Sequence, residues 1–312
     1  MIDAQIRSVL NKAKRAALST PGIKGVDYGY IYKAGERTEE IGIRFHVERK
    51  LAIADLTVSE LIPKNYYGLP CDVLQAKYSP QDDSGNAKDI VRPLRPGISI
   101  GNKTNRSTGT LGIFVKDKAA NICILSNWHV LVGSSDAPVN KEITQPGPEH
   151  FGMDVPPTVA YLLRWLSLDL GLDAAVASLA KDIQYDAEVF GINVKVEGVK
   201  DPELGMHVVK SGSVSAITYA IIDGVEGSFS VDYSDYGDKE RWMDGFHLVK
   251  DVQKTEDEVS LDGDSGSVWF DPLDNMAVAL NFAGEDGLGP TADYALGHPL
   301  TKILKDLSVD LL

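Results

Sequence analysis

The sequence predicts a mainly β protein that is preceded by a small α+β domain. Three observations predict this class. Residues 2–18 carry apolar side chains at helical spacing and are followed by alternating strands, whereas short apolar runs separated by polar turns recur later in the chain. Between the two parts, residues 79–96 contain three prolines and no periodicity, which indicates a linker. We therefore expect one domain over residues 1–78 and a larger one over residues 97–312.

The elements of the N-terminal domain follow from local patterns. The helix ends at Pro21-Gly22, where proline and glycine stop helical pairing. None of the later elements carries a chemical motif, so an interaction module, an intramolecular inhibitor and an assembly surface all stay open. These elements are expected over residues 26–32 (strand), 41–47 (strand), 58–61 (short helix) and 72–76 (strand).

Composition and charge argue against several classes of protein. The chain carries 31 basic and 45 acidic residues, a net charge of −14, whereas binding to nucleic acid needs a basic face. No stretch approaches the roughly 20 apolar residues of a membrane helix, and the N-terminus lacks the apolar core of a signal peptide. Cys71 and Cys123 are too few for a disulfide framework. We expect a cytoplasmic protein with no membrane or nucleic-acid partner.

No metal and no cofactor are expected. The histidines at positions 150, 207, 247 and 298 have no ligand-like spacing to one another or to the cysteines. His46 lies on an alternating strand and is interpreted as structural.

Residues 262–267, with the sequence Asp-Gly-Asp-Ser-Gly-Ser, offer a nucleophile in a glycine-rich turn. A serine attacks a carbonyl at neutral pH when a base takes its proton. Flanking glycines let the chain turn tightly enough for backbone N–H groups to converge on an oxyanion. Because Gly, Asp and Ser are also common turn residues, the motif alone leaves an ordinary loop open.

A candidate base follows a predicted hairpin. Apolar residues 111–115, the polar turn 116–118 and apolar residues 122–125 predict two strands, and His129 lies just past the second. A single histidine beside apolar residues is more often structural, so this prediction depends on its order relative to Ser265.

A candidate acid opens the apolar run over residues 172–179. An acidic residue at this place must be partly buried, and a buried carboxylate needs a partner. Asp173 is therefore the candidate for orienting a histidine. Asp169 and Asp154 are rivals, but neither begins an apolar strand.

The order His129, Asp173, Ser265, with Gly-Asp-Ser-Gly around the serine, resembles that of trypsin-like serine proteases. Three further stretches resemble elements of the same family: a strand and turn of the second barrel, the strand that binds substrate backbone, and the closing helix. These are residues 205–213, 276–284 and 294–304. The low cysteine content is similar to that of intracellular members of this family. Residues 109–112 and 125–130 are most similar to plant NARROW LEAF-type and related bacterial members.

The resemblance implies a fold and an activity for residues 97–312. The fold would be two six-stranded antiparallel β-barrels of chymotrypsin type. The activity would be that of a serine endopeptidase acting on proteins or peptides, with Ser265 as nucleophile, His129 as base and Asp173 orienting the base. The N–H groups of Gly263 and Ser265 would form the oxyanion hole.

The resemblance also implies a specificity pocket. Its base falls at Val259, and its wall is formed by Asn281, Phe282 and Ala283. Because no acidic residue occupies the base, we expect a small or medium apolar side chain in the pocket. A shift of register onto residues 256–258, all acidic, would overturn that expectation.

Activation is left open by the sequence. In zymogen-type relatives the residue equivalent to Asp264 pairs with an N-terminal amine released by cleavage, whereas about a hundred residues precede this domain. Asp264 therefore either uses another partner or awaits cleavage near residues 92–101. An effector, a protein partner or homo-oligomerisation could also activate the site, and acidic residues concentrated over 223–264 could form a gate or a solvated surface. A silent binding protein of the same fold and a hydrolase of esters remain as alternatives.

Overall fold

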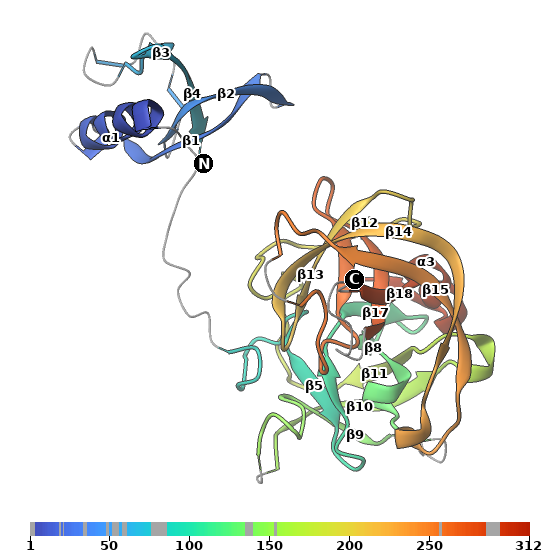
Figure 1. The fold of residues 1–312 in the computed structure, drawn as a ribbon. Helices are drawn as coiled ribbons and strands as arrows, with labels where there is room; N and C mark the ends of the chain where they lie inside the picture. Colours follow the sequence, from blue (N-terminus) through green and yellow to red (C-terminus); the bar gives the residue numbers. More distant parts are fainter. Residues whose placement is uncertain are drawn as a thin grey trace. The chain divides into compact units, whose positions relative to one another are not determined.

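The computed structural model describes residues 4–18, 20, 22–33, 36–47, 50–51, 56–57, 61–75, 86–134, 140–152, 155–255, 258–284 and 294–312. The chain divides into two compact units, Met1–Asp82 and Asp83–Leu312, each of which can be followed in Figure 1. No helix within the described ranges is long and apolar enough to cross a membrane.

The first unit is one helix packed on a small sheet. The helix α1 turns Val9, Leu10 and Ala13 toward Ile43 and Phe45, and these five side chains are buried together. The spacing of Val9, Leu10 and Ala13 places these three residues on one face of α1. Residues 58–60 of the expected short helix lie outside the described residues. The elements are α1 (Ala4–Leu18), β1 (Ile23–Lys33), β2 (Glu36–Val47), β3 (Asn65–Tyr66) and β4 (Leu69–Gln75), with sheet order β1-β2-β4-β3.

The first sheet of the second unit has eight strands in the order β19-β7-β8-β11-β10-β9-β5-β6. The short helix α2 (Trp128–Leu131) directly follows β8, and the 3-10 helix η2 (Leu168–Leu170) precedes β11. The strands are β5 (Ser99–Asn102), β6 (Thr108–Thr110), β7 (Ile113–Asp117), β8 (Ile122–Ser126), β9 (Glu142–Thr144), β10 (Thr158–Trp165), β11 (Ala175–Leu179) and β19 (Val309–Leu311).

The second sheet has seven strands in the order β12-β17-β16-β13-β14-β15-β18, and β17 also pairs with β18, so the sheet closes on itself. The chain is thus mainly β, as predicted, while the two six-stranded barrels remain a prediction. The strands are β12 (Gly198–Val199), β13 (His207–Gly212), β14 (Ala216–Val231), β15 (Arg241–Lys250), β16 (Val268–Asp271), β17 (Met276–Gly284) and β18 (Tyr294–Pro299).

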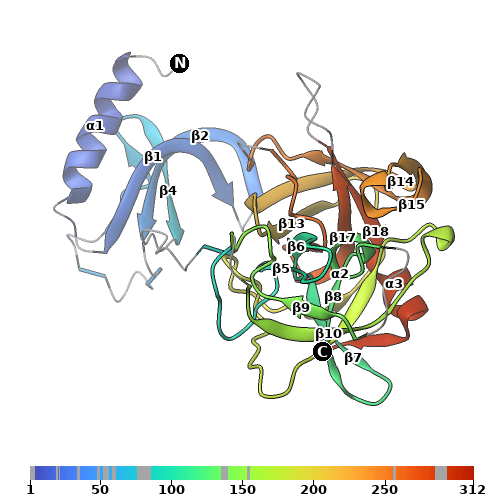
Figure 2. The same cartoon turned by 90° about the horizontal axis from the view of Figure 1, so that it is seen from below.

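A long hairpin connects the second sheet to the core of the first. Figures 1 and 2 show β14 and β15 as a curved ribbon that extends along the side of the unit. Its tip, residues 232–240, includes the 3-10 helix η3 (Ser234–Tyr236). Tyr233 of the tip and Met243 of β15 are buried in the same apolar cluster as Trp128 and Ile124 of the first sheet.

The C-terminal stretch differs from the expected closing helix. Residues Tyr294–Pro299 form β18, which pairs with both β15 and β17, and the helix α3 covers Leu300–Leu307 instead. Pairing on both sides overrides local helix propensity in the first half of this stretch.

The described part of the expected linker packs into the second unit. Leu94 has no exposed surface, its N–H donates to the Gln184 carbonyl, and its own carbonyl accepts from the Asp186 N–H. The second unit therefore includes residues upstream of Gly97.

We predict that Leu94→Ala lowers the free energy of unfolding of the second unit by about 2–5 kcal/mol, the usual cost of a cavity in a core. Ile90→Ala is the matched control, because Ile90 is 50% exposed, and it should change this free energy by less than about 0.5 kcal/mol. Urea unfolding followed by tryptophan fluorescence measures both. Equal effects of the two substitutions would contradict the packing.

Candidate active site

His129 lies in the short helix α2 at the end of β8 and is 7% exposed. The strand β8 is mostly apolar and buried, and it ends at Ser126. The chain then forms the single turn of α2. The side-chain amide of Asn127 donates to the Asp173 carbonyl at 2.8 Å. This contact ties the start of α2 to the stretch that carries the acid.

Asp173 and His129 are paired. The carboxylate of Asp173 is fully buried, and its Oδ2 lies 2.5 Å from His129 Nδ1 while its Oδ1 accepts from the His129 backbone N–H at 3.2 Å. Burial would raise the pKa of Asp173, but His129, His298 and a hydroxyl of the hairpin outweigh it and hold the pKa below its ordinary value. An ionised carboxylate only accepts, so Nδ1 of His129 carries a proton and Nε2 is left as a base.

The rival acids are placed differently. Asp169 is 73% exposed at its side chain and forms an ion pair with Arg241. Asp154 lies outside the described residues. Of the described candidates, Asp173 alone contacts His129.

The loop that carries Ser265 lies against the strand β6 and close to the helix α2. The Thr110 N–H donates to the Ser265 carbonyl at 2.8 Å. A Cβ on Gly109 would lie 2.4 Å from Val130, the neighbour of His129, and 2.7 Å from the Ser265 carbonyl, so this close approach requires glycine. Ser265 is half-buried, and within the described residues its hydroxyl makes no hydrogen bond with His129. Such bonds are often long in unliganded sites.

Two backbone N–H groups beside the serine are unengaged. Within the described residues the N–H groups of Asp264, Gly266 and Ser267 donate to backbone carbonyls, whereas those of Gly263 and Ser265 have no acceptor. Gly263 has φ of +100°, a region in which a side chain would be strained. The arrangement offers two donors to an incoming oxyanion.

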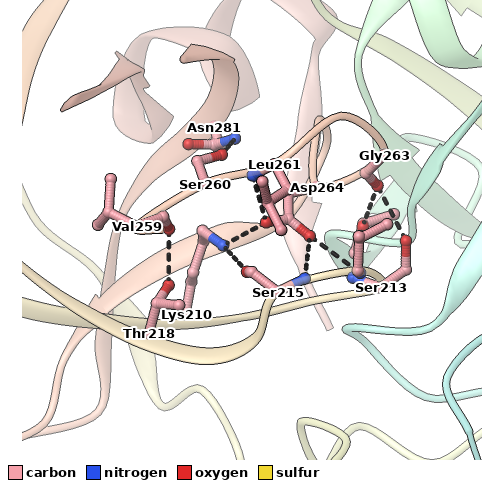
Figure 3. A network of polar contacts seen from close by, with 12 residues as sticks. Lys210, Ser213, Ser215, Thr218, Val259, Ser260, Leu261, Gly263, Asp264 and Asn281 are labelled. Carbon is pink, nitrogen blue, oxygen red and sulfur yellow. Dashed lines mark hydrogen bonds and ion pairs between the residues drawn. The ribbon is translucent and has the colours of Figure 1, made fainter. Parts of the chain in front are cut away.

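A buried ion pair anchors this loop from below (Figure 3). Lys210 Nζ lies 2.9 Å from Asp264 Oδ2, and both side chains are fully buried. Oδ1 of Asp264 accepts from the backbone N–H groups of Val214 and Ser215, and Oδ2 also accepts from that of Leu261. Burial would raise the pKa of Asp264, but the Lys210 ammonium and these hydrogen bonds lower it below its ordinary value.

Two hydroxyls fix the neighbouring peptide. The carbonyl of Gly263 accepts from Thr110 Oγ1 at 2.8 Å and from Ser213 Oγ at 2.9 Å, one donor from each sheet. The loop is therefore held on both sides, and its unengaged N–H groups keep one orientation.

Two of the residues predicted to form the pocket, Val259 and Asn281, are linked through Ser260. Val259 is buried, and its carbonyl accepts from Thr218 Oγ1 at 2.9 Å. Its neighbour Ser260 accepts from the Asn281 amide at 3.0 Å, as Figure 3 shows. Asn281 is itself held by bonds to the serine loop, since its carbonyl accepts from the Gly266 N–H.

Phe282 packs against His298 and has little exposure to solvent. It is 3% exposed, and its ring stacks on His298 with centroids 3.7 Å apart. His298 Nε2 accepts from the Asp173 N–H at 3.1 Å, and its Nδ1 donates to the Asp244 carbonyl at 2.5 Å. Burial lowers the pKa of His298 to about 4, which keeps the imidazole neutral in both roles. Ala283, the last predicted wall residue, is partly buried in β17.

Sequence reasoning missed three residues that support this site. Lys210 directly follows Val208 and Val209 in β13, and a charged residue beside apolar ones is a weaker form of the signal that marked Asp173. His298 and Tyr233 carry no comparable local signal, because their roles depend on contacts 125 and 60 residues away in sequence. No cluster of three or more potential metal ligands occurs in the described part of the chain.

Comparisons with solved structures identify the fold. The chain is similar to Nocardiopsis protease (13% identity, TM-score 0.51), Thermobifida fusca protease A (14%, 0.50) and Cellulomonas bogoriensis chymotrypsin (16%, 0.50). Each likeness covers 70% of this chain and 98% of the other. These are serine proteases of chymotrypsin fold, and at such identities the likeness shows the fold alone. No protein-family model and no curated protein matches the chain, so the narrower likeness to NARROW LEAF-type members stays a prediction.

We predict that Lys210→Met lowers the free energy of unfolding at pH 7 by about 3–5 kcal/mol, because it leaves Asp264 buried and unpaired. The loss should shrink as the pH falls. In the wild type the lowered pKa of Asp264 stabilises the fold above the ordinary aspartate pKa of about 4, and this stability is lost in acid. In the variant the unpaired Asp264 should have a raised pKa, so it destabilises the fold least once it is protonated.

Urea unfolding at pH 7 and pH 5 tests this prediction. Lys302→Met is the control, since Lys302 pairs with Asp306 at the surface and should contribute about 0.5 kcal/mol or less. A Lys210→Met effect as small as that of the control would contradict the role of the buried pair.

Proposed function

We propose that the protein is a serine endopeptidase that uses Ser265, His129 and Asp173 through an acyl-enzyme. The observation that carries the proposal is the contact of His129 with Asp173. Its Nδ1 lies 2.5 Å from a fully buried carboxylate, which leaves Nε2 as the basic nitrogen. Gly109 lies against both Val130 of α2 and the Ser265 carbonyl, so the serine loop approaches the helix that carries His129. The shared fold supports a peptidase without establishing activity.

The proposed chemistry begins with attack of Ser265 Oγ on a peptide carbonyl. His129 Nε2 takes the hydroxyl proton as the new C–O bond forms, and Asp173 stabilises the resulting imidazolium. The negative charge passes to the carbonyl oxygen, which accepts from the N–H groups of Gly263 and Ser265. Loss of one such donor costs about 2.7–4 kcal/mol of barrier.

The second half returns the enzyme to its start. The imidazolium of His129 gives its proton to the leaving amine as the C–N bond breaks, and an ester to Ser265 remains. Water then attacks the ester with His129 again as base, and the acid product leaves with Ser265 re-protonated. All protons are conserved within the site and the water.

We further propose a peptide or protein substrate with a small or medium apolar side chain at the cleaved position. Val259, without charge and fully buried, is the proposed base of that pocket. Asn281 and Ala283 of β17 are its proposed wall, while the ring of Phe282 is engaged with His298.

The proposed enzyme needs no cleavage to form its oxyanion hole. Asp264 already holds the Lys210 ammonium, so the place that a liberated amine would take is filled. The alternative cleavage region also includes part of β5, which pairs with β6 and β9 and is fully buried. Activation by an effector or by assembly remains compatible with these contacts.

We predict that a fluorophosphonate probe labels Ser265 in the wild type and not in Ser265→Ala, because only an activated serine reacts. His129→Ala should also abolish labelling, and peptide hydrolysis by either variant should fall by roughly 10⁴- to 10⁶-fold. Mass-spectrometric mapping of the adduct gives the site. Label on another residue, or a folded wild type that stays unlabelled, would favour a silent binding protein.

We predict that the intact chain is the active form. A chain whose N-terminus is shown by sequencing to be uncut should label at the same rate before and after limited proteolysis between residues 92 and 101. A rate that rises at least tenfold on cutting would show that an amine, and not Lys210, completes the site.

A further inference from the structure

The strongest unassigned contact near the site comes from the hairpin tip, residues 232–240. The hydroxyl of Tyr233 donates to Asp173 Oδ2 at 2.8 Å, the same oxygen that faces His129 Nδ1. Tyr233 is 2% exposed and lies in the tip that joins β14 to β15 of the second sheet, whereas Asp173 lies two residues before β11 of the first. A residue 60 positions away thus completes the set of donors around the carboxylate.

We propose that Tyr233 is a positioning residue for the triad, which it serves by holding the Asp173 carboxylate through a hydroxyl carried on the hairpin tip. This inference rests on the proposed function for its catalytic consequence. The contacts that link Tyr233 through Asp173 to His129 can be tested without measuring turnover of a substrate.

Other contacts dock the hairpin next to Asp173. The Asp244 N–H of β15 donates to the Gly171 carbonyl at 2.8 Å, two residues before the acid. Arg241 bridges Asp238 of the tip and Asp169 of η2, the 3-10 helix that precedes β11. The hairpin is thereby held at the segment that carries Asp173, and the tyrosine hydroxyl is brought to the carboxylate as part of that docking.

The aromatic surroundings orient the tyrosine ring. Its centroid lies 6.2 Å from that of Trp128 and 6.3 Å from that of Tyr236. Burial first, and then the Asp173 carboxylate, raise the pKa of Tyr233, so the phenol stays protonated and donates. The ring contacts do not need the hydroxyl, which can therefore be removed while the packing is kept.

The titratable groups facing Asp173 come from three elements: α2, which carries His129, β18 and the hairpin tip. His298 of β18 contacts the Asp173 backbone, and Tyr233 and Tyr236 come from the hairpin tip. Glu149, Asp235 and Asp262 act on Tyr236 from further out, and none of them is altered in the experiment.

Removal of the Tyr233 hydroxyl should change the pKa of His129 in one direction. Oδ2 shares its negative charge between the phenol and the imidazole, so loss of the phenol leaves more charge facing His129 and raises the pKa of its imidazole. The carboxylate also loses one of its restraints. We therefore expect the acid limb of the kcat/KM profile to move to higher pH, and kcat at its plateau to fall about 3- to 10-fold with KM unchanged.

The experiment compares Tyr233→Phe with Tyr161→Phe, a control in which the tyrosine is 41% exposed on β10. Proton NMR follows the low-field His129 Nδ1–H signal and the imidazole titration, and a peptide substrate gives the kcat and KM profiles. Tyr233→Phe should shift the signal and raise the pKa of His129, whereas Tyr161→Phe should match the wild type. An unshifted signal and unchanged pKa in Tyr233→Phe would overturn the inference.

A second variant keeps the test decisive if Tyr233→Phe fails to fold. Site-specific 3-fluorotyrosine at position 233 is a more acidic phenol and a stronger donor, so it should lower the pKa of His129 and move the acid limb the opposite way. No shift, or a shift in the same direction as Tyr233→Phe, would overturn the inference. If the wild type proves inactive while the NMR shifts occur, the proposed function fails and the positioning contact stands.

Discussion

The buried ion pair between Lys210 and Asp264 is the interaction on which the candidate site depends. Both charges lie out of water, and Asp264 precedes Ser265 directly, so the carboxylate fixes the start of the nucleophile loop. A buried pair contributes little net stability compared with apolar packing, yet removal of one partner is costly. Its consequence here is geometric, because the bonds to Val214, Ser215 and Leu261 leave the loop one arrangement.

Contacts between the two halves of the unit extend this constraint to the rest of the site. Thr110 of the first sheet binds both the Ser265 and Gly263 carbonyls, while His298 of the second sheet and Tyr233 of the hairpin tip contact Asp173. Each sheet therefore holds a group presented by the other. The relation between His129 and Ser265 follows from the packing of the sheets, so a shift of one against the other would disturb the acid and the nucleophile loop together.

Much of this arrangement could be predicted from the sequence because its signals are local. The glycines of the serine motif mark a tight turn, and the charge at Asp173 marks a polar contact inside an apolar run. The strand β17 was expected with the bounds that it has. What could not be predicted depends on long-range pairing: the strand conformation of residues 294–299, the reach of the β14–β15 hairpin, and the partner of Asp264. Lys210 is an exception, since a lysine within a buried strand is itself a local signal.

We propose that the loop around Ser265 holds an oxyanion hole ready in the intact chain. The decisive experiment is a crystal structure of the uncut protein after reaction with diisopropyl fluorophosphate. We expect phosphorus bonded to Ser265 Oγ, with the phosphoryl oxygen about 2.7–3.1 Å from the N–H groups of Gly263 and Ser265, and with Lys210 still paired to Asp264. An adduct whose phosphoryl oxygen points to solvent, or a Gly263 N–H turned away from it, would show that the loop holds no ready oxyanion hole.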